Sequence, residues 1–136
     1  MKREGFILFF LILFQLTAYS QLQTAETYYT RGVSRDKIGM YDEAIADFTK
    51  ATELDTKYSI AWFQRGYWKE ISGDLNGSLN DLNKAKELNP NDKDLYVSLA
   101  VTNYKLKNTT AACSYLNEAK NRGSLEADEL ILIMCK

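Results

Sequence analysis

The stretch that decides the fold is Ser59 to Pro90, SIAWFQRGYWKEISGDLNGSLNDLNKAKELNP. It predicts two short helices joined by a turn at Gly73-Asp74, because glycine can take the left-handed conformation in which helices often end. Pro90 closes the unit, since proline cannot continue a helix. Each predicted helix has small and apolar residues at spacings of three and four, which gives it one apolar face. A single pair of such helices cannot bury both faces by itself.

The same pattern occurs once before this stretch and once after it, at a shift of 34 residues. The matching positions of the preceding unit are Tyr28, Gly32, Gly39, Ala44, Phe48, Ala51 and Leu54. Those of the following unit are Tyr96, Ala100, Lys107, Ala112, Leu116, Ala119 and Arg122. Stacked neighbours bury the faces that single units leave open. The sequence therefore predicts an array of helical hairpins, with units at about 25–58, 59–92 and 93–124.

These residues resemble the tetratricopeptide repeat, whose unit length and W-x2-L-G…A-x3-F…P pattern they match over about residues 25–120. The resemblance implies an all-α fold, an α-solenoid of stacked antiparallel helix pairs that winds into a right-handed superhelix with a concave groove. It also implies a module for protein–protein interaction. The pattern is broken at Arg31 and Arg65, which stand where leucine is usual.

Both arginines are followed sixteen residues later by an aspartate, Asp47 after Arg31 and Asp81 after Arg65. The same two positions of the third unit hold no charge, since they are Leu99 and Tyr115. Charge is present at both positions or at neither, which favours an ion pair across each hairpin over an anion-binding site.

Trp68 has small counterparts in the neighbouring units, Ser34 and Thr102. A ring at this position either fills space against the first unit or is exposed and marks a contact. The first interpretation is favoured.

The first twenty residues differ from the rest of the chain. Lys2 and Arg3 are followed by the apolar run 6–14, and small residues, Ala18 and Ser20, precede Gln21. This is the layout of a secretory signal peptide. Because a membrane span needs roughly 20 apolar residues, the run favours cleavage after Ser20 over a retained anchor. We therefore expect a signal peptide at 1–20 and a mature repeat domain at 21–136.

Composition limits the chemistry that the chain can perform. It has no histidine, two cysteines and a net charge of −1. The commonest general base is thus missing, four cysteines for a zinc site are missing, and nothing indicates nucleic acid as a partner. Catalysis by acids alone would need paired carboxylates, and Glu26, Glu70 and Asp94 lie on different repeats. We expect neither enzyme activity nor a cofactor or metal.

A last helix from Leu125 to Met134 is expected to cap the array, within the segment 125–135. Cys113 and Cys135 lie ten and twelve residues from Gly123, so two antiparallel helices leaving that turn bring them to about the same height at ~1.5 Å per residue. An exported chain meets an oxidising compartment, where these cysteines could form a disulfide. Two buried free thiols are the alternative.

The resemblance places the groove along the first helix of each unit. Carried over position by position, the candidate protein-binding residues are Tyr29, Val33, Phe63, Gln64, Tyr67, Ile71, Val97 and Val101. The clamp for a terminal carboxylate found in chaperone-tail binders is missing, because its positions hold Tyr29, Val33, Gln64, Asp94 and Ser98. An aromatic and aliphatic floor suits a helix or an extended apolar segment. Alternatively, these residues pack on another copy or on a neighbouring subunit.

Taken together, the sequence predicts an exported adaptor or scaffold of a bacterial cell envelope, periplasmic or extracellular, that binds a protein or peptide without covalent chemistry. No nucleic acid and no membrane insertion after signal cleavage are expected, and self-association remains open. The alternative is a structural subunit whose groove is permanently filled within an assembly.

Overall fold

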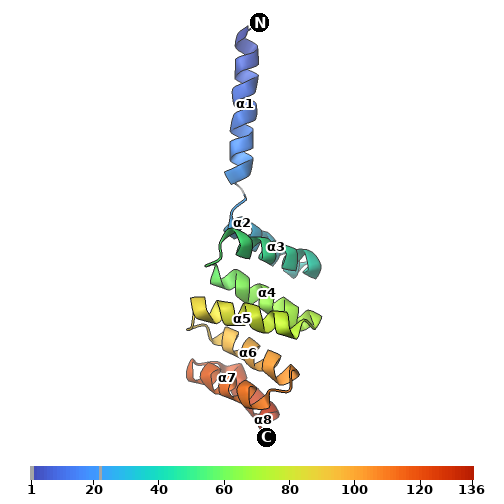
Figure 1. Ribbon diagram of the computed structural model, residues 1–136, viewed down its shortest axis with the longest axis vertical. Coiled ribbons are helices and arrows are strands. Elements are labelled where there is room, and N and C mark those ends of the chain that lie inside the picture. Colours follow the sequence, from blue (N-terminus) through green and yellow to red (C-terminus); the bar gives the residue numbers. More distant parts are fainter. Residues whose placement is uncertain (1, 22) are drawn as a thin grey trace.

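The structure is a computed structural model that describes residues 2–21 and 23–136, and of residues 2 and 16–21 the backbone alone. Helix α1 (Lys2–Gln21) extends from one end, and seven shorter helices form a stack (Figure 1). Three antiparallel pairs follow one another, and a single terminal helix completes the stack. The pairs are α2 (Ala25–Lys37) with α3 (Tyr41–Leu54), α4 (Ser59–Ser72) with α5 (Leu75–Leu88), and α6 (Lys93–Lys105) with α7 (Thr109–Asn121); the terminal helix is α8 (Leu125–Met134). The predicted all-α stack of helix pairs is confirmed.

Local sequence sets where the helices begin. The Thr24 hydroxyl accepts a hydrogen bond from the Thr27 amide, and the Asp92 carboxylate accepts from the amides of Asp94 and Leu95. Such side-chain caps replace backbone partners that the first turn of a helix lacks. Helices α2 and α6 therefore each begin directly after a residue whose side chain caps them.

The small residues of the repeat let the two helices of a pair approach closely. A Cβ atom on Gly32 would lie 2.7 Å from Phe48 Cε1, and one on Gly66 would lie 2.9 Å from Leu82 Cγ. Neither position has space for a larger side chain. The recurrence of glycine at these two positions is therefore a packing requirement.

The core runs along the middle of the stack. One cluster joins the second pair to the third and contains Leu82, Ala85, Leu95 and Leu99. A second cluster joins the third pair to α8 and contains Tyr96, Val97, Ala100, Leu116, Ala119 and Ala127. Between the second and third pairs the buried hydroxyls of Ser78 and Thr102 lie 3.2 Å apart, within hydrogen-bond distance. Each pair is thus covered by its neighbours.

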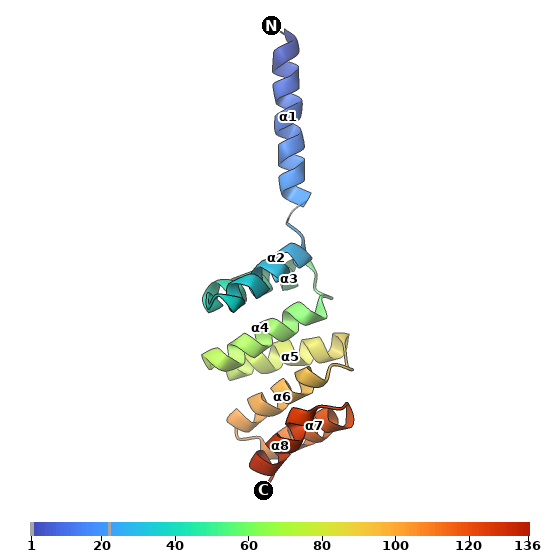
Figure 2. The same cartoon turned by 180° about the vertical axis from the view of Figure 1, so that it is seen from behind.

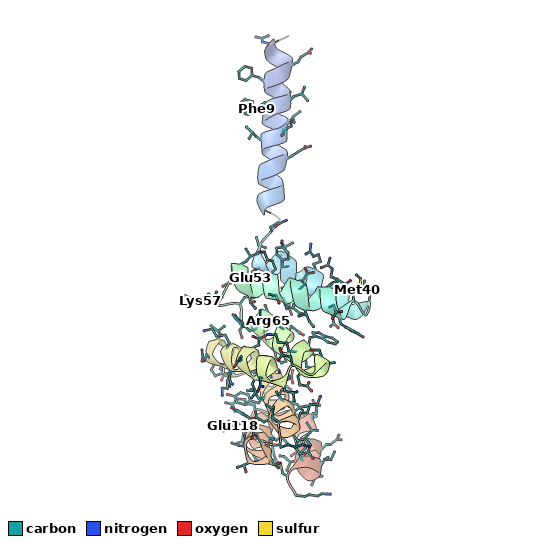
Figure 3. All side chains as sticks on the ribbon, turned by 45° about the vertical axis from the view of Figure 1, so that its right-hand side comes forward. Phe9, Met40, Glu53, Lys57, Arg65 and Glu118 are labelled. Carbon is teal, nitrogen blue, oxygen red and sulfur yellow. A yellow bond between two sulfur atoms is a disulfide. The ribbon has the colours of Figure 1, made fainter. Side chains whose placement is uncertain are left out.

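The expected ion pairs across the first two hairpins are confirmed. The Arg65 guanidinium donates to both carboxylate oxygens of the buried Asp81, at 2.6 and 2.7 Å, and Arg31 does the same to Asp47, at 2.9 and 2.6 Å. Arg65 also donates to the Thr52 hydroxyl of the first pair at 3.1 Å and lies inside the stack (Figure 3). These arginines are structural, because each fixes two helices to one another.

Trp68 packs against the first unit, as favoured by the sequence. Its ring is stacked on that of Tyr41 in α3, with centroids 4.5 Å apart. The ring is held between two pairs and is not an exposed contact. Its buried Nε1 has no hydrogen-bond partner within the described part of the chain.

The turn inside each pair adopts the left-handed conformation. Gly73 has φ 92°, whereas its counterpart in the third pair is Lys107, with φ 68°. A side chain in this region crowds the following carbonyl oxygen, which glycine avoids. The third turn therefore keeps the shape of the first two with a less suitable residue.

Helix α8 covers the end of the stack, and α7 and α8 lie side by side (Figure 2). Cys113 of α7 and Cys135, directly after α8, form a disulfide with Cα atoms 5.7 Å apart. The predicted bridge is confirmed, and the alternative of two free thiols is wrong. The bond fixes the far end of α8 to the third pair.

Helix α1 projects away from the stack, and its described side chains are exposed, Phe9 among them (Figure 3). Within the described part of the chain, none of the helices combines the length and apolar character that a membrane span requires. The side chains of Ala18 and Ser20, on which the cleavage prediction depends, lie outside the described ones, as do Met1 and Leu22. Cleavage after Ser20 stays a prediction.

Candidate protein-binding groove

The first helices of the three pairs and the terminal helix form one continuous row, called here the first-helix row (α2, α4, α6 and α8). Helix α4 contacts α6, and α6 contacts α8. Tyr29 of α2 joins the row to the next pair, because its ring lies 5.4 Å from that of Tyr58 at the start of α4. The predicted groove residues all belong to this row.

A cavity of about 330 Å³ opens between α4, α6 and α8, and we call it the hollow. Its apolar part comes from four of the predicted groove residues, which the fold brings together: Phe63, Tyr67, Val97 and Val101. Its polar part is Glu70, Asp94, Ser98 and Glu126. The hollow is therefore an apolar floor with carboxylates beside it, built from three helices.

The other four predicted residues lie outside the hollow. Tyr29 packs against Phe48 at 5.8 Å between ring centroids and is hydrogen bonded to the Gln64 side chain. Val33 is half-buried on α2, and Ile71 is exposed near the end of α4. The eight candidates thus divide into four that share one cavity and four that do not.

Two tyrosines at the α2 end have perturbed pKa values. Burial raises the pKa of Tyr29, and its hydrogen bond with Gln64 opposes that rise. Burial also raises the pKa of Tyr58, and the nearby charge of Glu26 adds to it. Both shifts favour the neutral phenol, as expected where aromatic rings fill the space between two pairs.

Phe63 contributes to the core as well as to the hollow. It packs against the cluster of Leu82, Ala85, Leu95 and Leu99 and is half-buried. Tyr67 is 39% exposed, and its ring meets Trp68 edge-on at 5.4 Å. Tyr67 is therefore the better residue for testing binding separately from folding.

The carboxylates of the hollow differ in their surroundings. Glu70 is buried and pairs with Lys105, whereas Asp94 and Glu126 are exposed on the first turns of α6 and α8. Within residues 2–21 and 23–136, no three acidic or cysteine side chains are close enough to hold a metal ion. The sequence does not single out Glu126, because an acidic residue in the first turn of a helix is favoured by the helix dipole whether or not it lines a site.

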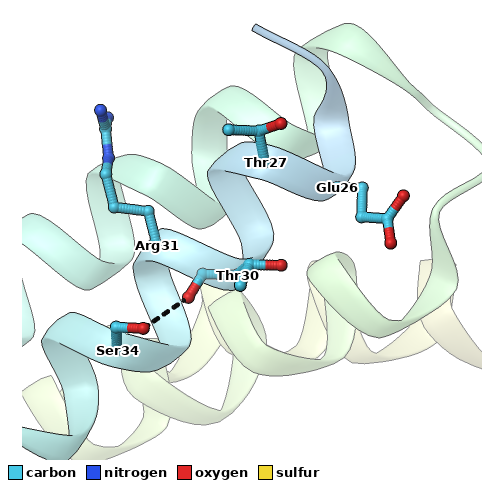
Figure 4. A pocket seen from close by; sticks show the side chains of 5 residues that line it. All are labelled: Glu26, Thr27, Thr30, Arg31 and Ser34. Atoms are coloured by element: carbon cyan, nitrogen blue, oxygen red, sulfur yellow. Dashed lines mark hydrogen bonds between the residues drawn. The ribbon is translucent and has the colours of Figure 1, made fainter. Parts of the chain in front are cut away.

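Two other depressions are each lined by one local segment. One, of about 470 Å³, lies along α2 beside Glu26, Thr27, Thr30, Arg31 and Ser34 (Figure 4). Another, of about 550 Å³, follows the turn at Lys107 into the start of α7. A ligand in either depression would contact one segment only, whereas a ligand in the hollow would contact three helices. Neither depression is therefore as good a candidate binding site as the hollow.

Comparison with known proteins agrees with this architecture. Residues 25–58 match the family described as tetratricopeptide repeat. The first TPR of Spaghetti (RPAP3), solved bound to the HSP90 peptide SRMEEVD, has a TM-score of 0.79 at 21% identity, covering 83% of this chain and 91% of that one.

Two further solved structures are similar. YrrB, described as a TPR protein with an unusual peptide-binding site, has a TM-score of 0.69 at 23% identity, covering 74% of this chain and 52% of YrrB. MamA has a TM-score of 0.70 at 22% identity, covering 78% of this chain and 62% of MamA. The chain thus contains a tetratricopeptide repeat and has the fold of tetratricopeptide-repeat domains.

Proposed function

We propose that this chain is a non-enzymatic adaptor or scaffold that binds a segment of a partner protein in the hollow of its first-helix row. The hollow is the observation that carries the proposal. It offers Phe63 and Tyr67 on one helix and Val97 and Val101 on the next, with polar groups beside them. Small apolar cavities with a few convergent polar groups are the usual form of binding sites.

The peptide-bound neighbour supports the same class of function. The first TPR of Spaghetti was solved with an HSP90 peptide, and YrrB is described by its peptide-binding site. We infer that a peptide or protein segment is the ligand here also. We infer that the side chains lining the hollow set which segment this chain prefers.

A structural role within an assembly is the second candidate, and α8 favours it. Leu132 and Ile133 on this helix are 69% and 67% exposed, although α8 ends the stack. Exposed apolar residues on a terminal helix suit contact with a neighbouring subunit or a second copy. If the chain has this structural role, a neighbouring subunit or a second copy would occupy the hollow permanently.

We propose further that the chain acts in a bacterial cell envelope after export and cleavage at Ser20. The basic start, the apolar run 6–14 and the small residues before Gln21 motivate this. The N-terminal sequence of protein purified from its own host tests it. A start at Gln21 supports export, and a start at Met1 with retention in the membrane contradicts it.

Affinity capture from the native envelope tests the adaptor function. The wild-type chain is compared with Tyr67→Ser and with a control changed at Asp42 and Lys50 to alanine, both exposed on α3. We expect Tyr67→Ser to lose the partner, since truncating an aromatic anchor typically costs ~2 kcal/mol or more. The control should keep it. Retention of every partner by a folded Tyr67→Ser chain would contradict the proposal.

A further inference from the structure

We propose that the hollow accepts an arginine or lysine side chain, so that the partner segment is basic. This inference rests on the proposed function and states which chemistry the site selects. It follows from the charge of the hollow, from one unpaired hydroxyl, and from the way in which this chain holds its own arginines.

Charge is the first argument. Carboxylates from three helices line the hollow, Glu70 from α4, Asp94 from α6 and Glu126 from α8. Lys105 pairs with Glu70, whereas the exposed carboxylates of Asp94 and Glu126 form no ion pair within the described part of the chain. Such a site attracts a cation and repels a terminal carboxylate or a phosphate. A wholly apolar segment would desolvate Asp94 and Glu126 without compensation.

Size and shape favour a single long side chain. At about 330 Å³ the hollow is near the lower end of ligand pockets, which run from about 300 to 1,000 Å³. Arginine and lysine bury an apolar stem and keep a charged head at the edge. Val97 and Val101 can receive the stem, and the carboxylates can receive the head. Tyr67, which is 39% exposed, adds an aromatic ring as a candidate cation–π partner.

Ser98 gives an independent observation. It lines the hollow and is only 9% exposed, and within the described part of the chain its hydroxyl makes no hydrogen bond. Its backbone carbonyl accepts from Thr102, so the side chain alone is unpaired. The oxygen is not fully buried, so it can bond to a group that enters the hollow. An N–H group of a guanidinium or ammonium entering the hollow would satisfy it.

The chain itself holds arginine by the same combination of groups three times. Arg65 lies 4.8 Å from the ring centre of Trp62 and binds Asp81; Arg31 lies 4.9 Å from Tyr28 and binds Asp47; Arg122 lies 4.1 Å from Tyr96 and binds Glu118. Each site joins an aromatic face to a carboxylate. The hollow likewise combines an aromatic ring, Tyr67, with two carboxylates, Asp94 and Glu126. A cation from a partner segment could bind there as the three arginines bind within the chain.

A peptide library measures this preference directly. The probe is a positional-scanning set of nine-residue peptides with acetylated and amidated ends, in which one position is fixed in turn as each amino acid. Binding to the full chain purified from its host is followed by fluorescence anisotropy. We expect pools with fixed arginine or lysine to bind about tenfold tighter than pools with fixed glutamate or leucine, the gain typical of one charge-assisted hydrogen bond.

Matched variants place the preference in the hollow. Asp94→Asn with Glu126→Gln should remove most of the tenfold preference. The control, Glu87→Gln with Asp128→Asn, removes the same charge from exposed positions outside the hollow and should keep it. Ser98→Ala leaves every charge in place and should weaken the arginine pool about tenfold, the cost of one bond to a charged group. Thermal melts show that each variant is folded.

The remaining outcomes separate this inference from the proposed function. Tighter binding of pools with a fixed apolar or acidic residue would overturn the inference and would leave the adaptor function in place. Equal loss in the hollow variant and in the control also overturns it, because overall charge would then explain the preference. If no pool binds, the inference fails, and capture with Tyr67→Ser decides separately whether the adaptor function fails with it.

Discussion

The two ends of the first-helix row are built on the same repeat positions and yet differ in what occupies them. Tyr29, Phe63 and Val97 are equivalent, as are Val33, Tyr67 and Val101. At the α2 end the ring of Tyr29 packs on Phe48 and Tyr58 and fills the space. At the α8 end two valines face two aromatic rings, and a cavity remains. The cavity thus depends on one repeat position, where Val97 is smaller than its counterpart Tyr29, since Val33 and Val101 are both valine.

Helix α8 is the other cause of the difference. The α2 end has no described helix packed on its outer side, whereas α8 adds Glu126 to the hollow and is fixed by the disulfide. If this account is right, changes near α8 alter the hollow, and equivalent changes at the α2 end do not.

Removal of the disulfide should have the largest effect. Changing Cys113 and Cys135 together to serine opens a loop with a sequence separation of 22 residues. Loop-closure entropy then lowers the unfolding free energy by about 3 kcal/mol, measured by urea denaturation. Hydrogen exchange should rise in α8 and stay unchanged in α2 and α3. Unchanged exchange in α8 would mean that the bond does not hold the wall of the hollow.

The buried ion pairs should differ between the first two pairs. Asp81→Ala strands Arg65, whose side chain is 14% exposed, and should cost about 2 kcal/mol of unfolding free energy. Asp47→Ala strands Arg31, which is 52% exposed, and should cost about 1 kcal/mol because solvent screens it.

A double-mutant cycle of Arg65→Ala with Asp81→Ala checks that the two residues interact. The double variant should lose less than the sum of both single changes. Strict additivity would refute the pairing and would leave Arg65 open to a ligand role.

Filling the hollow should block binding at one end of the row only. Val101→Tyr places a ring in the hollow and should weaken partner binding about tenfold or more, equal to about 1.4 kcal/mol. Val33→Tyr, at the equivalent position of α2, is the matched control and should leave affinity unchanged. Both are measured by titration calorimetry. Equal loss in both variants would remove the distinction between the two ends.

The smallest effect is expected at the third turn. Lys107→Gly relieves the left-handed strain and should raise the unfolding free energy by about 0.5–1 kcal/mol, after the entropy of glycine in the unfolded chain is subtracted. Lys107→Ala keeps a Cβ at φ 68° and should gain nothing. Thermal melts compare the two. A higher unfolding free energy for Lys107→Ala would show that the charge of Lys107, and not the left-handed backbone conformation, destabilises the third turn.

Much of the fold could be predicted because a few residues constrain it strongly. The turn at Gly73-Asp74 and the recurrence of small and apolar residues at a shift of 34 predicted the paired helices. Arg65 and Asp81 appear or disappear together, which predicted their contact. The similar distances of Cys113 and Cys135 from Gly123, ten and twelve residues, permitted the bridge that the structure contains.

The hollow itself could be predicted only in part. Phe63, Tyr67, Val97 and Val101 followed from the repeat register, but position alone does not say whether a ring points into its own pair, as that of Tyr29 does. The place of Glu126 depends on the rotation of α8 about its axis, which no spacing in the sequence fixes. Side-chain direction and the docking of a single terminal helix are tertiary properties.

Amide NMR shows directly whether a partner segment binds in the hollow. The ¹⁵N-labelled chain is titrated with the segment of a captured partner. The account predicts that shift changes gather on α4, α6 and α8 around Tyr67, Ser98, Val101 and Glu126. Changes confined to the outer helices α3, α5 and α7, or to Leu132 and Ile133 of α8, with the hollow unaffected, would contradict it.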